Sequence, residues 1–148
     1  MKLIKDKYKY PELQRVENEL GRFYIDSEGQ EVPSVTNVLS TTSDQSGIDE
    51  WKRRVGLEEA ERVLQESSSI GSNVHNALEN YLQDKEWKII DDGSYISKTS
   101  ILILESFINN LVNDINEVWG LEAGLILDGL YAGTCLLYTS DAADDTRS

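Results

Sequence analysis

Apolar residues at helical spacing predict helices in the first half of the chain. Trp51 and Val55 lie four residues apart, so they share one face of a helix expected over residues 48–55. Gly56 should end that helix. A second helix is expected over residues 57–65, where apolar residues recur at the same spacing.

Two further helices are expected along the chain. The serine run at residues 67–69 should interrupt the second helix and cap a third one over roughly residues 70–83. The clearest amphipathic stripe lies in a helix expected over residues 99–116. Its apolar members are Leu104, Phe107, Ile108, Leu111, Val112 and Ile115.

Residues with β propensity and turn chemistry predict two hairpins. The first spans residues 22–32 around a polar turn. The second has a strand over residues 117–127, a turn at Asp128-Gly129 and a partner strand that begins over residues 130–134. Helices therefore precede an antiparallel hairpin, and the expected fold class is α+β, or α/β with the sheet only begun.

The composition narrows the cellular setting. The 148 residues include one cysteine, Cys135, so neither a disulfide framework nor a cysteine metal site is expected, and a reducing cytosol fits. Residues 1–6 lack the apolar run of a signal peptide, and no stretch is long and apolar enough to span a membrane. We expect a cytoplasmic protein with no membrane and no disulfide partner.

The formal net charge of −13 is unfavourable for a protein that binds nucleic acid, because contacts with phosphate need lysine and arginine. Two local basic groups nevertheless occur, one formed by Lys2, Lys5, Lys7 and Lys9, and one formed by Lys52-Arg53-Arg54. For lysines alone, solvated surface is the better interpretation. An acidic nuclease can still work through a local basic groove, but this charge argues against non-specific coating of DNA.

The only histidine lies beside a carboxylate. His75 and Glu79 are four residues apart and share one helix face, and Gly71 lies one turn earlier, where a missing side chain would let a metal, phosphate or strand approach. Imidazole and carboxylate both suit Mn²⁺, whereas Mg²⁺ prefers carboxylate and water. Taken alone, such a pair is more often a surface hydrogen bond than a pair of metal ligands.

The order of these features resembles the PD-(D/E)XK nuclease superfamily. Gly71, His75 and Glu79 are followed by a long amphipathic helix, a strand with Glu122, a tight turn and the stretch Tyr131-Ala132-Gly133-Thr134. The likeness is to the RecB-like branch, which includes tailed-phage exonucleases and the mitochondrial genome maintenance exonuclease. Further matching pieces are Pro33-Ser34-Val35-Thr36, Trp51 and Arg53 before Val55-Gly56, the serine run ahead of Gly71, and Val118-Trp119-Gly120-Leu121-Glu122.

The resemblance implies a restriction-endonuclease-like α/β core, of which this chain would hold an N-terminal hairpin, helices and the first two antiparallel core strands. It implies a metal-dependent DNA exonuclease of phage type in a bacterial host cell, with Mg²⁺ or Mn²⁺ that polarises the scissile phosphate. By the same resemblance His75, Glu79 and Glu122 would hold or support the metal, Gly71, Ser72, Lys52 and Arg53 would contact substrate, and Gly133 and Thr134 would precede the catalytic aspartate.

Two departures from the family pattern bear on activity. Ser72 stands where the family often has threonine, which is a mild change. Leu136 stands where the metal-binding aspartate is expected, and no acidic–x–lysine pair follows it. We therefore expect the chain as written to be catalytically inactive, whereas an intact parent would be a deoxyribonuclease dependent on Mg²⁺ or Mn²⁺.

The sequence changes character after Thr134. Residues 135–144 are what TGT CTC TTA TAC ACA TCT GAC GCT GCC GAC encodes, a string that resembles the mosaic end of a transposon-based sequencing adapter translated in frame. Residues 1–134 are accordingly interpreted as the N-terminal part of a PD-(D/E)XK exonuclease domain. Residues 135–148 are interpreted as a non-native, disordered tail.

A non-catalytic protein-interaction adaptor is the alternative from another functional class. It would bind a protein through the helical surface, with Trp51 and the helix after Thr99. The acidic charge and the missing ligands favour the adaptor, whereas the motif order and the foreign tail favour the nuclease. A DNA-binding module without cleavage is a weaker alternative, because it would need a basic helix face.

Overall fold

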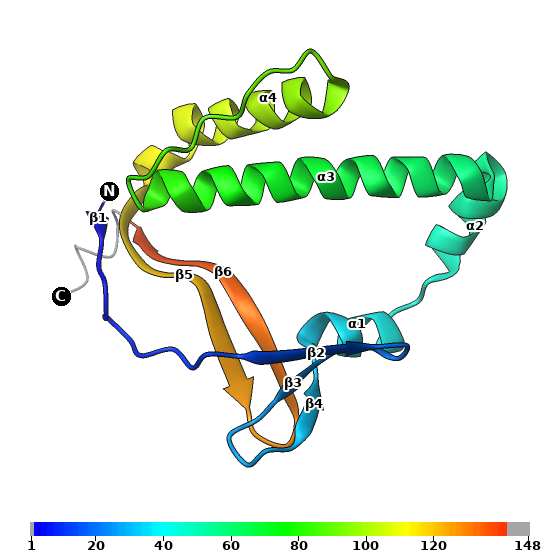
Figure 1. Cartoon of the computed structure of the whole chain (residues 1–148), viewed down its shortest axis with the longest axis horizontal. Coiled ribbons are helices and arrows are strands. Elements are labelled where there is room, and N and C mark those ends of the chain that lie inside the picture. Colours follow the sequence, from blue (N-terminus) through cyan, green and yellow to red (C-terminus); the bar gives the residue numbers. More distant parts are fainter. Residues whose placement is uncertain (1, 142–148) are drawn as a thin grey trace. The chain divides into compact units, whose positions relative to one another are not determined.

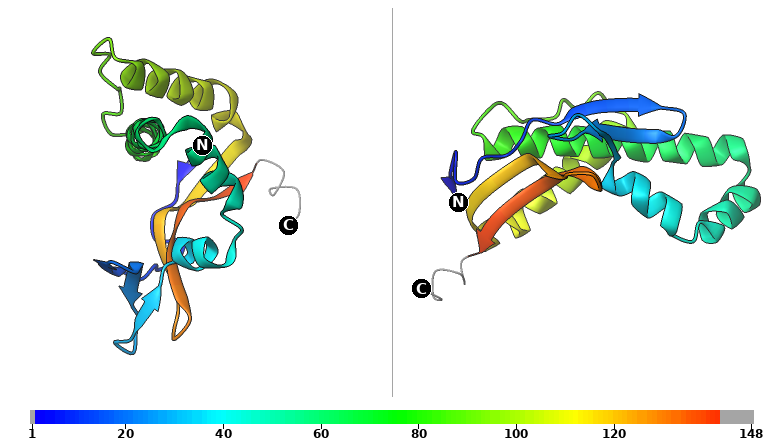
Figure 2. Two further views of the ribbon diagram at one scale, coloured as in Figure 1. Left: turned by 90° about the vertical axis from the view of Figure 1, so that its right-hand side faces the viewer. Right: turned by 90° about the horizontal axis from the view of Figure 1, so that it is seen from below.

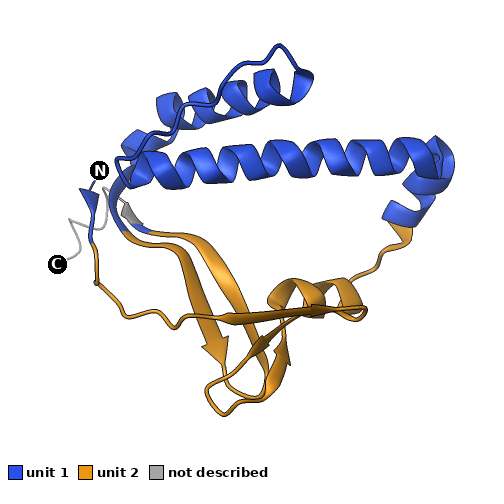
Figure 3. Cartoon of the chain, in the orientation of Figure 1, with its two compact units in different colours: residues 1–4, 48–118, 139–148 blue, residues 5–47, 119–138 orange. Residues whose placement is uncertain are grey.

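The computed structural model describes residues 2–141, and the chain divides into two compact units (Figures 1 and 3). The helical unit takes its described residues from 1–4, 48–118 and 139–148, and the sheet unit consists of residues 5–47 and 119–138. The fold class is α+β, because the described part of the chain holds four α-helices and two three-stranded sheets. The restriction-endonuclease-like core stays a prediction.

The first two helices have clear local boundaries. Helix α1 (Val35–Thr42) begins at a serine cap, since Ser34 Oγ accepts the Asn37 N–H at 3.0 Å. Helix α2 (Ser46–Val55) ends at Gly56, whose φ of 90° favours glycine over residues with a side chain. The predicted helix over residues 48–55 and its end at Gly56 are confirmed.

Helix α3 (Leu57–Leu82) is one continuous helix of 26 residues. The prediction of two helices separated by the serine run is wrong, because residues 67–69 lie inside α3. Serine is only mildly unfavourable in a helix interior. Ala60 and Val74 are buried on either side of the run, so packing on both sides keeps the helix intact.

Helix α4 (Tyr95–Asn110) lies beside α3 (Figures 1 and 2). It begins and ends earlier than the predicted range of 99–116: Ser94 Oγ accepts the Ser97 N–H at 3.1 Å as a cap, and a 3₁₀ turn, η1 (Val112–Asp114), follows the helix. The predicted stripe therefore extends past the end of α4, and among its six members Leu104 is the one classed as buried.

Strand β5 (Ile115–Leu127) begins in the helical unit and confirms the predicted strand. The short strand β1 (Lys2–Leu3) pairs with it in parallel, with Lys2 opposite Glu117 and Leu3 opposite Val118. Val118 is fully buried. The sequence pattern did not predict β1, because two residues are too short to show a period.

The sheet unit contains an antiparallel sheet of β2 (Gln14–Asn18), β3 (Gly21–Ile25) and β4 (Glu31–Pro33). The predicted hairpin over residues 22–32 is the β3–β4 pair and is confirmed. The core of the unit consists of Tyr24, Val32 and Ala132, with Leu13 and Ile126 packed against it.

Strand β6 (Tyr131–Asp141) follows the predicted turn, in which the Leu130 N–H donates to the Leu127 carbonyl oxygen at 3.0 Å. The strand does not stop at Thr134, so the expectation of disorder is wrong for residues 135–141. Its side chains alternate over residues 135–139, with Leu136 and Tyr138 exposed and their neighbours half-buried, as is typical of a strand. Residues 142–148 of the predicted tail lie outside the described residues.

A buried carboxylate joins the two hairpins of the sheet unit. Asp26 Oδ1 accepts the N–H groups of Glu28 at 2.9 Å and Gln30 at 2.8 Å, and its Oδ2 accepts the Gly129 N–H at 2.8 Å. The neighbouring Ser27 donates its N–H and its hydroxyl to the Asp128 carboxylate. The main-chain donors, Gln30 foremost, hold the pKa of Asp26 below its usual range.

We expect Asp26→Asn to lower the urea midpoint of unfolding at neutral pH, because the amide turns an NH₂ group toward main-chain donors. The native pKa of Asp26 is lowered, so its stabilisation is present above the unfolded pKa of about 3.9 and is lost as pH falls through the native value. The difference in the urea midpoint between wild type and Asp26→Asn should therefore disappear as the pH is lowered.

The exposed Glu19→Gln variant provides the control. Urea titrations followed by circular dichroism at neutral and acidic pH measure all three proteins. A gap between wild type and Asp26→Asn that stays constant across this range would contradict the role of the ionised carboxylate.

Candidate functional site

The predicted site residues fall into both units. The helical unit holds Gly71, Ser72, His75 and Glu79 on α3 and Lys52 and Arg53 on α2, whereas the sheet unit holds Glu122, Gly133 and Thr134. Within residues 2–141, no three histidine, cysteine, aspartate or glutamate side chains are grouped so that they could hold a metal ion.

On α3, His75 is exposed and Glu79 is half-buried. The Glu79 carboxylate is engaged locally, since its Oε1 accepts a hydrogen bond from Gln83 Nε2 at 3.3 Å. A Cβ built on Gly71 would meet no atom within 4 Å, so the space beside this residue is open. The helix thus offers two donors on one face and open surface one turn away, which is fewer ligands than a metal site needs.

The basic group Lys52-Arg53-Arg54 lies in the last turn of α2. Cations at this end of a helix interact favourably with the helix dipole. Arg53 also donates from Nε to the Asp49 carbonyl oxygen at 3.4 Å. At this position the group stabilises the C-terminal end of α2. The predicted contact of Lys52 and Arg53 with substrate stays a prediction.

A cavity of about 400 Å³ in the helical unit is lined by both polar and apolar residues of α3, α4 and the segment between them. Among them Asp92 has its pKa lowered to about 2, first by hydrogen bonds from the Ser94 side chain and N–H and then by the Ser97 hydroxyl. These contacts belong to the cap of α4. His75 and Glu79 are not among the residues that line this cavity.

A second cavity, of about 430 Å³, lies within the sheet unit. It brings together two motif segments that are far apart in the sequence, Ser34-Val35-Thr36 and Gly133-Thr134. The remaining lining is mainly apolar and includes Tyr24, Leu125, Leu127 and Tyr131. The sequence pointed to each segment separately, but nothing in its spacing predicted that they share a cavity.

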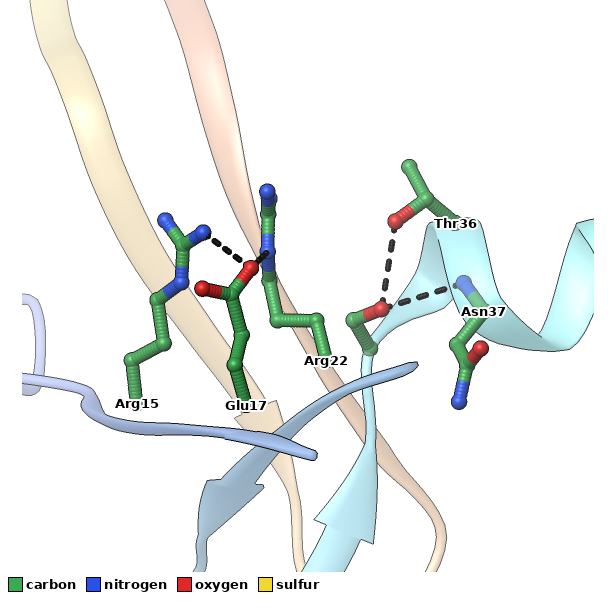
Figure 4. A network of polar contacts seen from close by, with 6 residues as sticks. Arg15, Glu17, Arg22, Thr36 and Asn37 are labelled. Atoms are coloured by element: carbon green, nitrogen blue, oxygen red, sulfur yellow. Dashed lines mark hydrogen bonds and ion pairs between the residues drawn. The ribbon is translucent and has the colours of Figure 1, made fainter. Parts of the chain in front are cut away.

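Close packing at this cavity depends on a serine and a glycine. Ser34 is buried, and its hydroxyl both accepts the Asn37 N–H and shares a hydrogen bond with Thr36 Oγ1 at 3.1 Å (Figure 4). A Cβ on Gly133 would lie 3.1 Å from Val35 Cγ2, so a side chain there would displace Val35. The absence of a side chain at position 133 therefore lets Val35 pack closely against β6.

Arg22 lies at the edge of the same cavity and was not singled out from the sequence. Its Nε is buried without a hydrogen bond and forms an ion pair with Glu17 Oε1 at 3.6 Å (Figure 4). Arg15 pairs with the same carboxylate at 2.5 Å and is the main reason that the pKa of Glu17 is lowered. These side chains are largely exposed, so the pairs contribute little to stability.

Glu122 interrupts the regular alternation of β5. Its φ of 48° is left-handed, and buried positions shift from Val118 and Gly120 to Ala123. On a strictly alternating strand Glu122 would share a face with Val118 and Gly120, but Glu122 is exposed where they are buried. Such a shift is typical of a β-bulge, a feature that re-aims side chains beside functional sites.

Comparisons of the chain with protein-family models, with curated proteins and with solved structures find no match. The family assignment therefore depends on the sequence resemblance. Among the residues that the structure describes, no helix has the length and apolar character needed to cross a membrane, and Cys135 is a free thiol.

We expect Glu122→Gly to be more stable than Glu122→Ala, although alanine is normally preferred in a strand. Both substitutions remove the carboxylate, but only glycine adopts the left-handed conformation without strain, a difference of about 1 kcal/mol. Chemical denaturation measures the difference. A higher stability of the alanine variant would show that residue 122 is not left-handed.

Gly71→Ala should stabilise the chain by about 1 kcal/mol, because alanine is the better residue in a helix interior and the added Cβ meets no atom. Thermal unfolding followed by circular dichroism at 222 nm is the measurement. Gly133→Ala serves as the contrasting variant, since its Cβ presses on Val35 and should lower the melting temperature. A destabilised Gly71→Ala variant would indicate that the glycine is needed for packing.

Proposed function

We propose that this chain is the N-terminal part of a metal-dependent DNA exonuclease of phage type, from the PD-(D/E)XK superfamily. One observation supports the proposal above the others. Ser34-Val35-Thr36 and Gly133-Thr134, two of the segments on which the resemblance depends, line one cavity in the sheet unit. Gly133 and Thr134 lie on the second strand of a hairpin, the position from which the family presents its aspartate.

The chain as written would be inactive, because its donor set does not fit a catalytic magnesium or manganese ion. Leu136 is 42% exposed on β6 and offers no ligand where the aspartate is expected. His75 and Glu79 supply only two donors on α3. Hydrolysis of the phosphodiester bond is accordingly attributed to an intact parent.

A protein-interaction adaptor is the second candidate, and one observation favours it. Large apolar side chains are exposed on α3 and α4 of the helical unit, including Leu57 at 78% and Leu102 at 67%. Exposed apolar surface of this kind marks protein contacts when it is contiguous. In a longer nuclease the same side chains would be covered by the rest of the domain.

The purified chain should show no Mn²⁺-dependent cleavage of single- or double-stranded DNA above the background of a mock purification. Leu136→Asp should be equally inactive, because one carboxylate without the acidic–x–lysine pair leaves the site incomplete. Appreciable metal-dependent cleavage by either protein would contradict the assignment of missing ligands.

Long-read sequencing of the source DNA separates the nuclease from the adaptor. The nuclease proposal expects Gly133-Thr134 to continue into an aspartate, followed by an acidic–x–lysine pair on the next strand. A longer reading frame that retains Cys135, Leu136 and the residues after them would overturn it.

A further inference from the structure

The sheet unit begins with lysines that alternate with tyrosines. Lys5, Lys7 and Lys9 are exposed, and Tyr8 and Tyr10 lie between and beside them. For lysines alone, a solvated surface is sufficient explanation. The structure adds that the tyrosines belong to an organised aromatic cluster, which a solvated tail would not have.

The aromatic cluster consists of Tyr8, Tyr10, Trp119 and Tyr138, all within the sheet unit. Tyr8 stacks on Tyr138, with ring centroids 5.9 Å apart and an interplanar angle of 28°. Trp119 meets both rings edge-on, at 6.4 Å from Tyr8 and 5.5 Å from Tyr138. Tyr8 is nevertheless 46% exposed, so its ring is fixed in orientation but accessible.

Strand β5 holds this segment in place. The Tyr10 hydroxyl donates to the Trp119 carbonyl oxygen at 3.0 Å. Gly120 makes the approach feasible, because a Cβ there would lie 2.7 Å from the Tyr10 hydroxyl oxygen. Gly124 does the same further along, since its Cβ would lie 2.6 Å from the Pro11 carbonyl oxygen. The lysines therefore project from a segment that is anchored at several points.

One of the lysines, Lys7, also contacts the cluster. Lys7 Nζ lies 4.5 Å from the centroid of the Trp119 ring, within range of a cation–π interaction. One acidic residue, Asp6, interrupts the three lysines, so the segment is locally basic in a chain of net charge −13. At physiological salt, screening over about 8 Å weakens the influence of acidic residues that lie farther away than this.

We propose that Lys5 to Tyr10 and Trp119 form a platform that binds single-stranded nucleic acid. Bases would stack on the exposed Tyr8 ring, and phosphates would pair with Lys5, Lys7 and Lys9. Sequence-independent binding of single strands uses this combination of aromatic faces and a basic path. The choice of DNA as the strand depends on the proposed nuclease function, whereas the stacking and the phosphate contacts do not.

Tyr138 lies beyond Thr134, in the segment attributed to a foreign sequence. The proposal therefore depends on Tyr8 and the lysines, which lie before the change in sequence character. Tyr138 covers part of the Tyr8 ring in stacked geometry, so in this chain a nucleobase would stack on the part of the ring that stays exposed. A nucleobase would use the same kind of contact.

Fluorescence anisotropy of a labelled oligothymidylate of about ten nucleotides, titrated with the whole chain in EDTA, tests the proposal. EDTA removes divalent cations, so the result does not depend on nuclease chemistry. Tyr8→Ala should weaken binding about tenfold, and Tyr8→Phe should keep it within a factor of two. Tyr95→Ala, an exposed tyrosine on α4, is the matched control.

The combined Lys5→Gln, Lys7→Gln and Lys9→Gln variant should lower the slope of log affinity against log salt by about 2. The matched control carries Lys85→Gln, Lys88→Gln and Lys98→Gln in the helical unit. Circular dichroism of every variant checks that the fold is retained. Duplex DNA should bind more weakly than the single strand, because its bases are not free to stack.

Three results would overturn the platform: no binding of the oligothymidylate at low salt, equal loss in the control variants, or unchanged affinity of Tyr8→Ala. Competition by polyglutamate as effective as that by unlabelled oligothymidylate would also overturn it, because a mere cation cluster predicts that outcome. Binding with the expected variant effects and no cleavage in Mn²⁺ would support the platform independently of the nuclease proposal.

Discussion

The carboxylate of Asp26 accepts N–H groups from its own loop, at Glu28 and Gln30, and from Gly129 in the turn between β5 and β6. An ionised carboxylate that is buried needs such donors, and a turn with a left-handed glycine exposes an N–H that can provide one. The bond to Gly129 therefore satisfies both groups and joins segments about a hundred residues apart. Ser27 and Asp128 repeat the connection beside it.

The packing between the two hairpins of the sheet unit lies beside this connection. With the two hairpins joined, Ala132 is buried with Tyr24 and Val32, and it forms a parallel bridge with Ser34. That bridge brings the N-terminus of α1 against β6, and Gly133 then allows Val35 to approach. The cavity between the two motif segments is a consequence of these contacts, which is why neither segment alone indicated it.

Periodicity predicted those elements whose boundaries are local. Gly56 ends α2 through a left-handed conformation, and Asp128-Gly129 makes the turn between β5 and β6, so both could be read from residue type. The serine run at residues 67–69 does not interrupt α3, because the burial of Ala60 and Val74 outweighs the weak preference of serine against helix. The left-handed Glu122 could not be predicted, since glutamate has no tendency toward that conformation.

The segment after Thr134 shows that the secondary structure of a segment does not reveal whether its sequence is native. Leu136 and Tyr138 lie on one face of β6 and alternate with less exposed residues. This pattern is enough to extend β6 beside β5, because a strand needs only β propensity and a partner for its main chain. Formation of a strand therefore carries no information about whether the residues are native. Residue type at one position bears on function instead, since Leu136 offers no metal ligand, whereas the proposed nuclease would carry an aspartate there, followed by an acidic–x–lysine pair. The residue at position 136 in the unbroken gene, rather than the shape of the hairpin, is thus where the nuclease and adaptor proposals make different predictions.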